Sequence, residues 1–358
     1  MDTLNDHAKA GENGRPIPEI NLISMIQRPS IHHQKQLSVM GQRLLFQTNY
    51  RPFLETAEHA FGRFPPAAQD NRPPLRFQLF RHSPEPGDGS GKPSLTARSH
   101  GHLFTLSAGE ANFVVADLQQ GYAFGYLSEA LAENLDYVRY TFIEAAVQAM
   151  LGLSRGFAAI HAAAVVKNDL CLLLCGPSGT GKSTLAYACL RSGYQLLSED
   201  VVQANVAGEA LVLWGMPWKC HLMAESLQFF PELAGKEERL QVNGKWKVPL
   251  NLAESYPGAM VTSARNGRLV FLEKSRAGVP AALTPLSPAE ARARFEVIWS
   301  WEGGWQGRYE QRLNELLAAG AYHLQLGRTP ADSIQALEQV FARKSRSPKT
   351  AIAEGGDW

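Results

Sequence analysis

The first half of the chain carries apolar and polar positions in the patterns of both β-strands and a helix. Leu75 to Phe80 alternates with a period of two, which places Leu75, Phe77 and Leu79 on one face of a predicted strand. Three further strands are predicted at 102–106, 112–117 and 122–126. The polar, glycine- and proline-rich stretch at 83–92 is predicted to be a loop.

From Leu135 to Leu151 the spacing of apolar residues changes to that of an amphipathic helix, with Val138, Phe142 and Met150 on one face. Strands followed by a helix predict an N-terminal mixed α/β domain over residues 21–154. No arrangement of catalytic residue types stands out in this region.

The second half begins near residue 155 and has a different pattern. Leu170 to Cys175 is a continuous apolar run, typical of a strand buried on both faces in a parallel sheet. Other strands are predicted at 159–166, 195–197 and 269–272, and late helices at 287–295 and 331–343. The expected fold class is α/β, with a central parallel or mixed sheet flanked by helices over residues 155–343. The polar segments 1–20 and 344–358 are expected to be disordered.

Composition narrows the choice of partners and compartment. The 358 residues include 35 Lys and Arg against 34 Asp and Glu, so the net charge of +1 argues against nucleic acid or a membrane surface as the main partner. No apolar run approaches the roughly 18 residues of a membrane span. The polar first residues do not have the pattern of a secretory signal peptide. Four cysteines without a CxxC pair or ligand cluster indicate reduced thiols, so a cytoplasmic protein is expected.

A glycine-rich segment directly after the apolar run matches the phosphate-binding pattern G-x-x-x-x-G-K-[ST]. It consists of Gly176, Pro177, Ser178, Gly179, Thr180, Gly181, Lys182 and Ser183, and Thr184 follows as a further expected contact. Glycines let the backbone turn tightly and direct its N–H groups at phosphate oxygens, while the next helix adds positive partial charge at its amino end. The Lys182 ammonium suits the β- and γ-phosphates, and the Ser183 hydroxyl suits Mg²⁺. The segment therefore predicts binding of ATP with Mg²⁺.

Two acidic residues, Glu199 and Asp200, follow the strand predicted at 195–197. Ligands of open α/β sheets bind at the carboxyl ends of strands, so this pair is expected beside the phosphates. A carboxylate there can hold Mg²⁺ or accept the proton of an attacking hydroxyl. Adjacent side chains of an extended chain point to opposite sides, so one acid is expected to face the phosphates. Asp200 joins Ser183 as predicted metal ligand, and the choice of general base between Glu199 and Asp200 stays open.

Three elements at fixed spacing resemble the C-terminal kinase domain of HPr kinase/phosphorylase. His161 stands fifteen residues before Gly176, and Glu199 stands seventeen residues after Lys182. That family has a histidine strand, then the phosphate-binding loop, then an acidic pair at similar spacing. The similarity covers residues 155–275, and the combined spacing is more specific than the loop pattern alone.

The resemblance implies an ATP-dependent kinase that acts on a serine hydroxyl of a peptide or protein. Glu199 and Asp200 take the places of the acidic pair, one as general base and one near Mg²⁺. His161 takes the place of the family's active-site histidine, and Lys182 completes the expected catalytic set. Relatives are often oligomeric, so a homo-oligomer is an open expectation.

The chain departs from the family pattern at several positions. Ala162 follows His161 in place of glycine, and the first acid is glutamate. The stretch 211–218 lacks the glutamate and arginine of the family's L-E-x-R-G-L-G-I signature, with Val212 and Trp214 in their places. These changes argue against phosphorylase activity and HPr as the acceptor. They favour the HPr-kinase-like peptide kinases, including those associated with lasso peptides.

A few residues outside these motifs are also of interest. Lys219 and His221 follow a strand-like run, and Lys245 and Lys247 lie in a turn expected to approach the phosphates, with plain solvated lysines as the alternative. The tryptophan-rich stretch 299–305 fits either a peptide groove or a core cluster. The alternative to a kinase is an ATP-binding regulator or degenerate kinase without efficient transfer.

Overall fold

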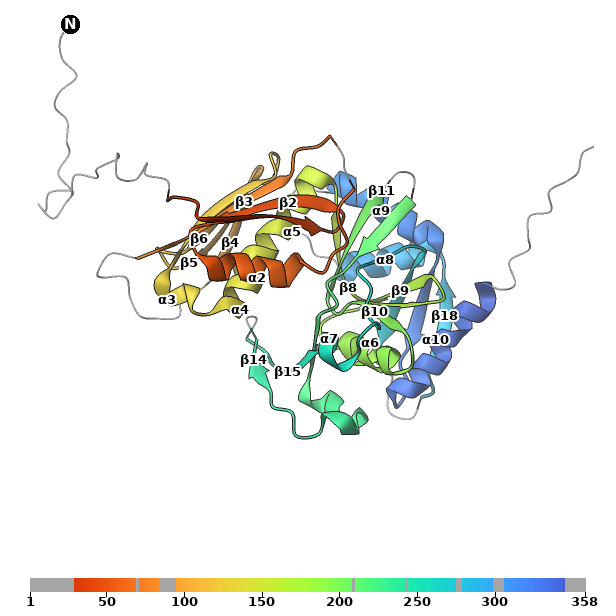
Figure 1. Ribbon diagram of the computed structural model, residues 1–358. Coiled ribbons are helices and arrows are strands. Elements are labelled where there is room, and N and C mark those ends of the chain that lie inside the picture. The colour runs from red at the N-terminus through yellow and green to blue at the C-terminus, as the bar shows by residue number, and fades with distance from the viewer. Residues whose placement is uncertain are drawn as a thin grey trace, which may run out of the picture.

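The computed structural model describes residues 29–68, 71–83, 95–207, 210–241, 244–274, 279–298 and 306–344. The segments expected to be disordered, 1–20 and 345–358, lie outside these ranges, while Lys344 ends the last helix. Most of the predicted loop at 83–92 and the tryptophan-rich stretch 299–305 also lie outside them. The described part is an α/β structure with several sheets and helices (Figure 1).

A seven-stranded sheet is built from the first half of the chain. Its strand order is β1-β2-β3-β7-β6-β5-β4, with β3 parallel to both neighbours and the other pairs antiparallel. The strands are β1 (His33–Val39), β2 (Gln42–Thr48), β3 (Leu75–His82), β4 (Leu95–His100), β5 (Leu103–Ala108), β6 (Phe113–Asp117) and β7 (Tyr122–Ser128). The face predicted for Leu75, Phe77 and Leu79 is confirmed, because all three side chains are buried. The strands β1, β2 and β4 were not predicted.

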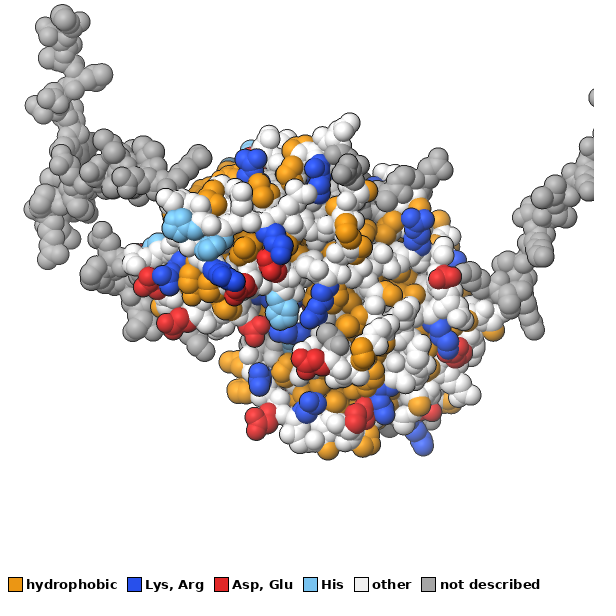
Figure 2. Space-filling model, viewed as in Figure 1, with side chains coloured by type: hydrophobic (Ala, Val, Ile, Leu, Met, Phe, Trp, Pro, Cys, Tyr) orange, Lys and Arg blue, Asp and Glu red, His pale blue; other side chains and the backbone are white. Residues whose placement is uncertain are grey.

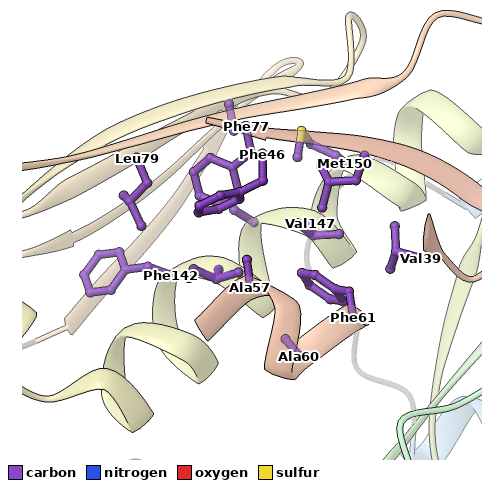
Figure 3. Close-up of a cluster of buried hydrophobic side chains, with 14 of the residues drawn as sticks. Val39, Phe46, Ala57, Ala60, Phe61, Phe77, Leu79, Phe142, Val147 and Met150 are labelled. Carbon is purple, nitrogen blue, oxygen red and sulfur yellow. The ribbon is translucent and has the colours of Figure 1, made fainter. Parts of the chain in front are cut away.

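Helices cover one face of this sheet. They are α2 (Arg51–Phe61), α3 (Glu129–Ala132), α4 (Leu135–Val138), a π-helix (Arg139–Glu144) and α5 (Ala145–Arg155). The helix predicted at 135–151 is confirmed as helical, but a π-helical turn interrupts it. Figure 3 shows the core beneath, where Phe46 and Phe77 of the sheet lie against Phe61 of α2 and Val147 and Met150 of α5. Burial of these large apolar side chains is the main force that holds helices to sheet.

A mixed sheet is built from the second half of the chain. Its order is β16-β12-β11-β8-β9-β17-β19-β18, and β10 also pairs with β8. The strands are β8 (Ala158–Lys167), β9 (Leu170–Cys175), β10 (Gln195–Ser198), β11 (Val201–Ala207), β12 (Ala210–Trp214), β16 (Ser263–Ala264), β17 (Gly267–Glu273), β18 (Ala282–Leu286) and β19 (Ala321–Gln325). The run Leu170–Cys175 forms a central strand in which every residue is buried, as predicted.

Helices pack on both faces of this second sheet. Leu172 and Leu174 of β9 face one core with α6 (Lys182–Arg191) and α10 (Pro330–Lys344). Leu173 and Cys175 face a second core with α8 (Pro288–Ile298) and α9 (Gln306–Ala319). The late helices predicted at 287–295 and 331–343 are therefore confirmed as α8 and α10. Within the described ranges, no helix is both long and apolar enough to cross a membrane.

A small three-stranded sheet lies beside α6. It contains β13 (Lys219–Leu222), β14 (Arg239–Leu240) and β15 (Trp246–Asn251) in the order β13-β15-β14, and α7 (Leu252–Ser255) follows. Short 3₁₀ turns at Ala224–Phe229 and Pro231–Leu233 connect β13 to β14. The four cysteines are buried free thiols, as the sequence predicts.

Trp218 joins the two halves of the molecule. It precedes β13, yet its side chain is only 5% exposed and belongs to the core of the first sheet. The indole Nε1 donates to the Ala60 carbonyl at the end of α2 at 3.2 Å, and Phe64 meets the ring edge-to-face at 5.8 Å between centroids. A buried tryptophan with its N–H satisfied is a strong anchor. The seven-stranded sheet is therefore fixed against the segment that leads to β13.

We expect Trp218→Ala to lower the free energy of unfolding by about 3–5 kcal/mol, because it leaves a cavity at the junction and removes one hydrogen bond. Trp246→Ala is the matched control, since that ring is 57% exposed, and its expected effect is about 0.5 kcal/mol. Urea unfolding followed by circular dichroism measures both. Equal effects of the two substitutions would show that Trp218 is not an anchor.

Candidate functional site

The glycine-rich segment forms the connection between β9 and α6. Gly179 has φ of +85° and Gly181, the residue before the helix, has φ of +99°, both in the region that favours glycine. Thr180 closes the turn, since its Oγ1 donates to the Pro177 carbonyl at 2.8 Å. The loop therefore delivers the chain directly to the amino end of α6, where unpaired N–H groups favour an anion.

Lys182 is the first residue of α6 and is only 7% exposed. Its Nζ donates to the carbonyls of Gly176 at 2.7 Å and Pro177 at 3.1 Å. Burial lowers the pKa of the Lys182 ammonium from its ordinary value, and the nearby Asp200 carboxylate acts in the opposite direction. A partly desolvated cation thus lies within the loop.

Glu199 is buried at the end of β10 and is bound by two side chains. Its Oε1 accepts from the Ser183 Oγ at 3.2 Å, and its Oε2 lies 2.8 Å from Nδ1 of His221 on β13. A carboxylate with an exposed fraction of 8% needs such partners, because burying an unpaired charge is costly. These two contacts fix Glu199 beside the first turn of α6.

A close backbone approach holds the β10 end in this place. A Cβ atom on Gly215, just after β12, would lie 1.9 Å from the carbonyl oxygen of Leu197. Real Cβ atoms do not come this near to an oxygen, so only glycine fits at this position. Gly215 therefore lets the segment after β12 pack closely on β10, the strand that ends just before Glu199.

Asp200, the residue after Glu199, pairs with His161. The strands β8 and β11 are antiparallel with His161 opposite Val201, which brings His161 Nδ1 to 3.2 Å from Asp200 Oδ1. Both side chains are substantially exposed, at 48% and 65%. Partial burial lowers the pKa of His161 from its ordinary value, and Asp200 partly offsets that effect.

Most of these groups line one cavity of about 950 Å³, whereas Glu199 is not part of its wall. Loop residues 178–181, the first turn of α6, His161, Asp200 and His221 all contribute to its wall. Its other basic side chains are those of Lys245, Lys247, Lys274 and Arg328, and apolar side chains come from Met223, Phe229, Leu326 and Pro330. The volume suits a nucleotide-sized ligand with a charged and an apolar end.

The structure shows which partners several residues singled out by the sequence contact. The Lys245 Nζ donates to the Ser178 Oγ at 2.7 Å, so the β14–β15 hairpin does approach the loop. The Ser183 hydroxyl contacts Glu199, whereas the sequence pairs it with Asp200 as metal ligand. The Thr184 hydroxyl is hydrogen-bonded to Ser226 at 2.7 Å.

A few side chains near the loop offer oxygen ligands for Mg²⁺. No group of three or more His, Cys, Asp and Glu side chains in the described ranges could hold a metal alone. The Ser183 hydroxyl and the Glu199 carboxylate are adjacent oxygens, with Asp200 next in the chain. Mg²⁺ is commonly held by one or two carboxylates together with phosphate oxygens. The residues present fit a magnesium ion that arrives with a nucleotide.

His221 is a site residue whose contact the sequence did not predict. The sequence singles out this histidine without a role, and only the pairing of β13 with β15 places it at Glu199. His221 lines the cavity together with His161. Glu199 therefore pairs with His221 of β13, and Asp200 pairs with His161 of β8.

Comparison with known proteins gives distant structural similarities only. No protein-family model matches the chain, and no curated protein matches it in sequence. A solved structure of the Hpr(Ser) kinase/phosphatase from Coxiella burnetii is similar over 53% of this chain and 90% of that chain, at 14% identity and a TM-score of 0.29. Similarity at this level assigns no activity to the present protein.

We expect His161 to titrate below its ordinary pKa of about 6.5, and Asp200→Asn to lower its pKa further, because the substitution removes the carboxylate that favours the imidazolium. The His161 ring then stays neutral down to a lower pH. Proton–carbon NMR of the imidazole Cε1 measures this, with His161→Gln to assign the signal. A pKa above 6.5 in the unsubstituted protein would contradict the dominance of burial.

Proposed function

We propose that this protein is a kinase that transfers the γ-phosphate of ATP to a hydroxyl, most simply a serine hydroxyl of a peptide or protein. The observation that carries the proposal is the single cavity shared by the glycine-rich loop, the amino end of α6 and the His161–Asp200 pair. It sets an anion-binding backbone opposite a carboxylate with room for a ligand between them.

The nucleotide would use both ends of the cavity. Backbone N–H groups of residues 179–183 and the Lys182 ammonium suit the phosphates, because phosphate bound at a helix amino end benefits from the helix dipole. Lys245 and Lys247 add positive charge from the hairpin side. The apolar side chains of Met223 and Leu326 suit the base or sugar.

The acidic pair would divide two tasks. Glu199, fixed by Ser183 and His221, would hold Mg²⁺ together with the Ser183 hydroxyl. A bound Mg²⁺ would supply charge neutralisation for the phosphates. Asp200 is more exposed and faces the cavity, which suits a group that must reach an incoming acceptor.

In the proposed reaction Asp200 accepts the proton of the acceptor hydroxyl. The acceptor oxygen forms a bond to the γ-phosphorus, and the bond from that phosphorus to the oxygen of the β-phosphate breaks, which releases ADP. His161 would orient the Asp200 carboxylate from the neighbouring strand. Lys182 would stabilise the negative charge of the transferred group.

We expect Lys182→Ala to weaken the binding of Mg-ATP by at least about tenfold, because a charge-assisted contact to phosphate is lost. Lys236→Ala is the control, since this exposed lysine lies outside the cavity and should leave the affinity unchanged. Isothermal titration calorimetry measures both variants. Absence of heat with the unsubstituted protein would end the proposal.

We expect Asp200→Asn to lower the rate of phosphate transfer by about 10²- to 10⁴-fold while the affinity for ATP changes little, because the general base is lost. Glu199→Gln should instead raise the Mg²⁺ concentration required. Mass spectrometry of serine peptides incubated with labelled ATP measures transfer, and Asp169→Asn in an exposed turn is the control. If ATP binds and the unsubstituted protein transfers no phosphate, the protein is a nucleotide-binding regulator. Transfer that neither substitution alters would contradict the roles given to Glu199 and Asp200.

A further inference from the structure

A second cavity of about 510 Å³ lies between the two halves of the molecule. Asp200, His221 and Lys247 line both this cavity and the larger one, so the two spaces meet at the proposed base. Figure 2 shows acidic, basic and histidine side chains gathered on the face where the two halves adjoin. A ligand in the smaller cavity would therefore reach Asp200 from the side opposite the glycine-rich loop.

The far wall of this cavity comes from the π-helix. Arg139, Tyr140 and Glu144, the residues of this turn that line the cavity, include both members of a buried ion pair. In an α-helix residues five apart do not face each other, whereas a π-turn aligns positions i and i+5. The Arg139 Nε accordingly donates to Glu144 Oε1 at 2.6 Å. Such turns are frequent at functional sites.

Arg139 has donor capacity that the protein does not use. Its side chain is only 3% exposed, and Nη1 is buried without a hydrogen-bond partner among the described residues. A guanidinium has five N–H donors, and an unsatisfied buried donor carries a free-energy cost that a ligand oxygen would remove. Burial also raises the pKa of the Glu144 carboxyl, against the opposing effect of Arg139.

Lys219 places a second cation at this end of the cavity. Its Nζ lies 5.3 Å from the Tyr140 ring centroid and 3.3 Å from Asp136, whose side chain is 76% exposed. At the other end of the cavity lie the carboxylates of Glu199 and Asp200. Glu144 and Asp136 partly offset the charges of Arg139 and Lys219, and Lys247 also lines the cavity. The unpartnered Nη1 of Arg139 is therefore what favours an anionic group at this end, away from the carboxylates of Glu199 and Asp200.

We propose that this second cavity is the acceptor site, and that it binds a peptide segment whose acidic side chain contacts Arg139 and Lys219 while its serine hydroxyl lies at Asp200. The inference rests on the proposed kinase function. A planar guanidinium with free donors suits a carboxylate. The volume suits a few residues of an extended segment, so the helical wall of residues 135–155 would select the acceptor while the second sheet carries the chemistry.

The test uses end-capped peptides that contain one serine and either Asp or Asn at a fixed offset of one to four positions on either side. Binding is measured by fluorescence anisotropy with a non-hydrolysable ATP analogue and Mg²⁺, and transfer is measured separately with ATP. At the best offset we expect the Asp peptide to bind at least about tenfold tighter than its Asn twin.

The double substitution Arg139→Gln with Glu144→Gln should reduce this ratio to about threefold, because it removes the guanidinium without leaving a buried carboxylate unpaired and keeps Lys219. Arg191→Gln with Glu232→Gln is the matched control, since this ion pair between α6 and the turn Pro231–Leu233 lies outside both cavities and should leave the ratio unchanged. If the double variant fails to fold, the single substitution Lys219→Gln is the deciding test. We expect it to lower the ratio of Asp-peptide to Asn-peptide affinity about threefold.

The proposal is overturned if no offset shows a preference for Asp. It is also overturned if the double substitution leaves the ratio unchanged or, where that variant does not fold, if Lys219→Gln leaves it unchanged. An Arg139-dependent preference without phosphate transfer would support the acceptor site and contradict the kinase function. Transfer without any preference for Asp would keep the kinase function and overturn the acceptor site.

Discussion

A carboxylate inside a protein must be surrounded by donors, and the arrangement of the site follows from how Glu199 meets that requirement. One oxygen is satisfied by Ser183 at the start of α6 and the other by His221 on β13. Three elements distant in sequence are thereby fixed around one side chain. Asp200, the next residue, is exposed and lines the cavity from the bend between β10 and β11.

The two halves of the molecule contribute to this centre in different ways. The second sheet carries the glycine-rich loop, the two acids and His161. The first half contacts the same region through its core, which holds the Trp218 side chain, and through the π-helix. The segment from Gly215 to His221 runs from the end of β12 through the core of the first sheet to Glu199. His221, at the end of that short segment, lines both cavities.

Much of the local structure is predictable because it depends on residues close in sequence. The alternation at Leu75–Phe80, the apolar run at Leu170–Cys175 and the glycine-rich turn all reflect local preferences that the tertiary structure preserves. Strand β1 was missed because its sequence, HQKQLSV, is mostly polar and the strand lies at the edge of its sheet.

The contacts of the site were less accessible from the sequence. Alternation predicts that Glu199 and Asp200 diverge, but only the packing of β13 and α6 decides which acid meets Ser183. His161 reaches Asp200 through the register of β8 and β11, strands whose pairing has no local signal. Arg139 and Glu144 are five residues apart, so a helical period of 3.6 treats them as unrelated until the π-turn is seen.

The two carbonyl contacts of Lys182 have a consequence for the shape of the glycine-rich loop. The ammonium donates to two acceptors of its own backbone, so this side chain helps the glycine turns to hold the loop in its curve. A phosphate bound as proposed would compete with these carbonyls for the ammonium. A loop held in this way would need little further ordering of its backbone on binding an anion, which lowers the entropic cost of the complex.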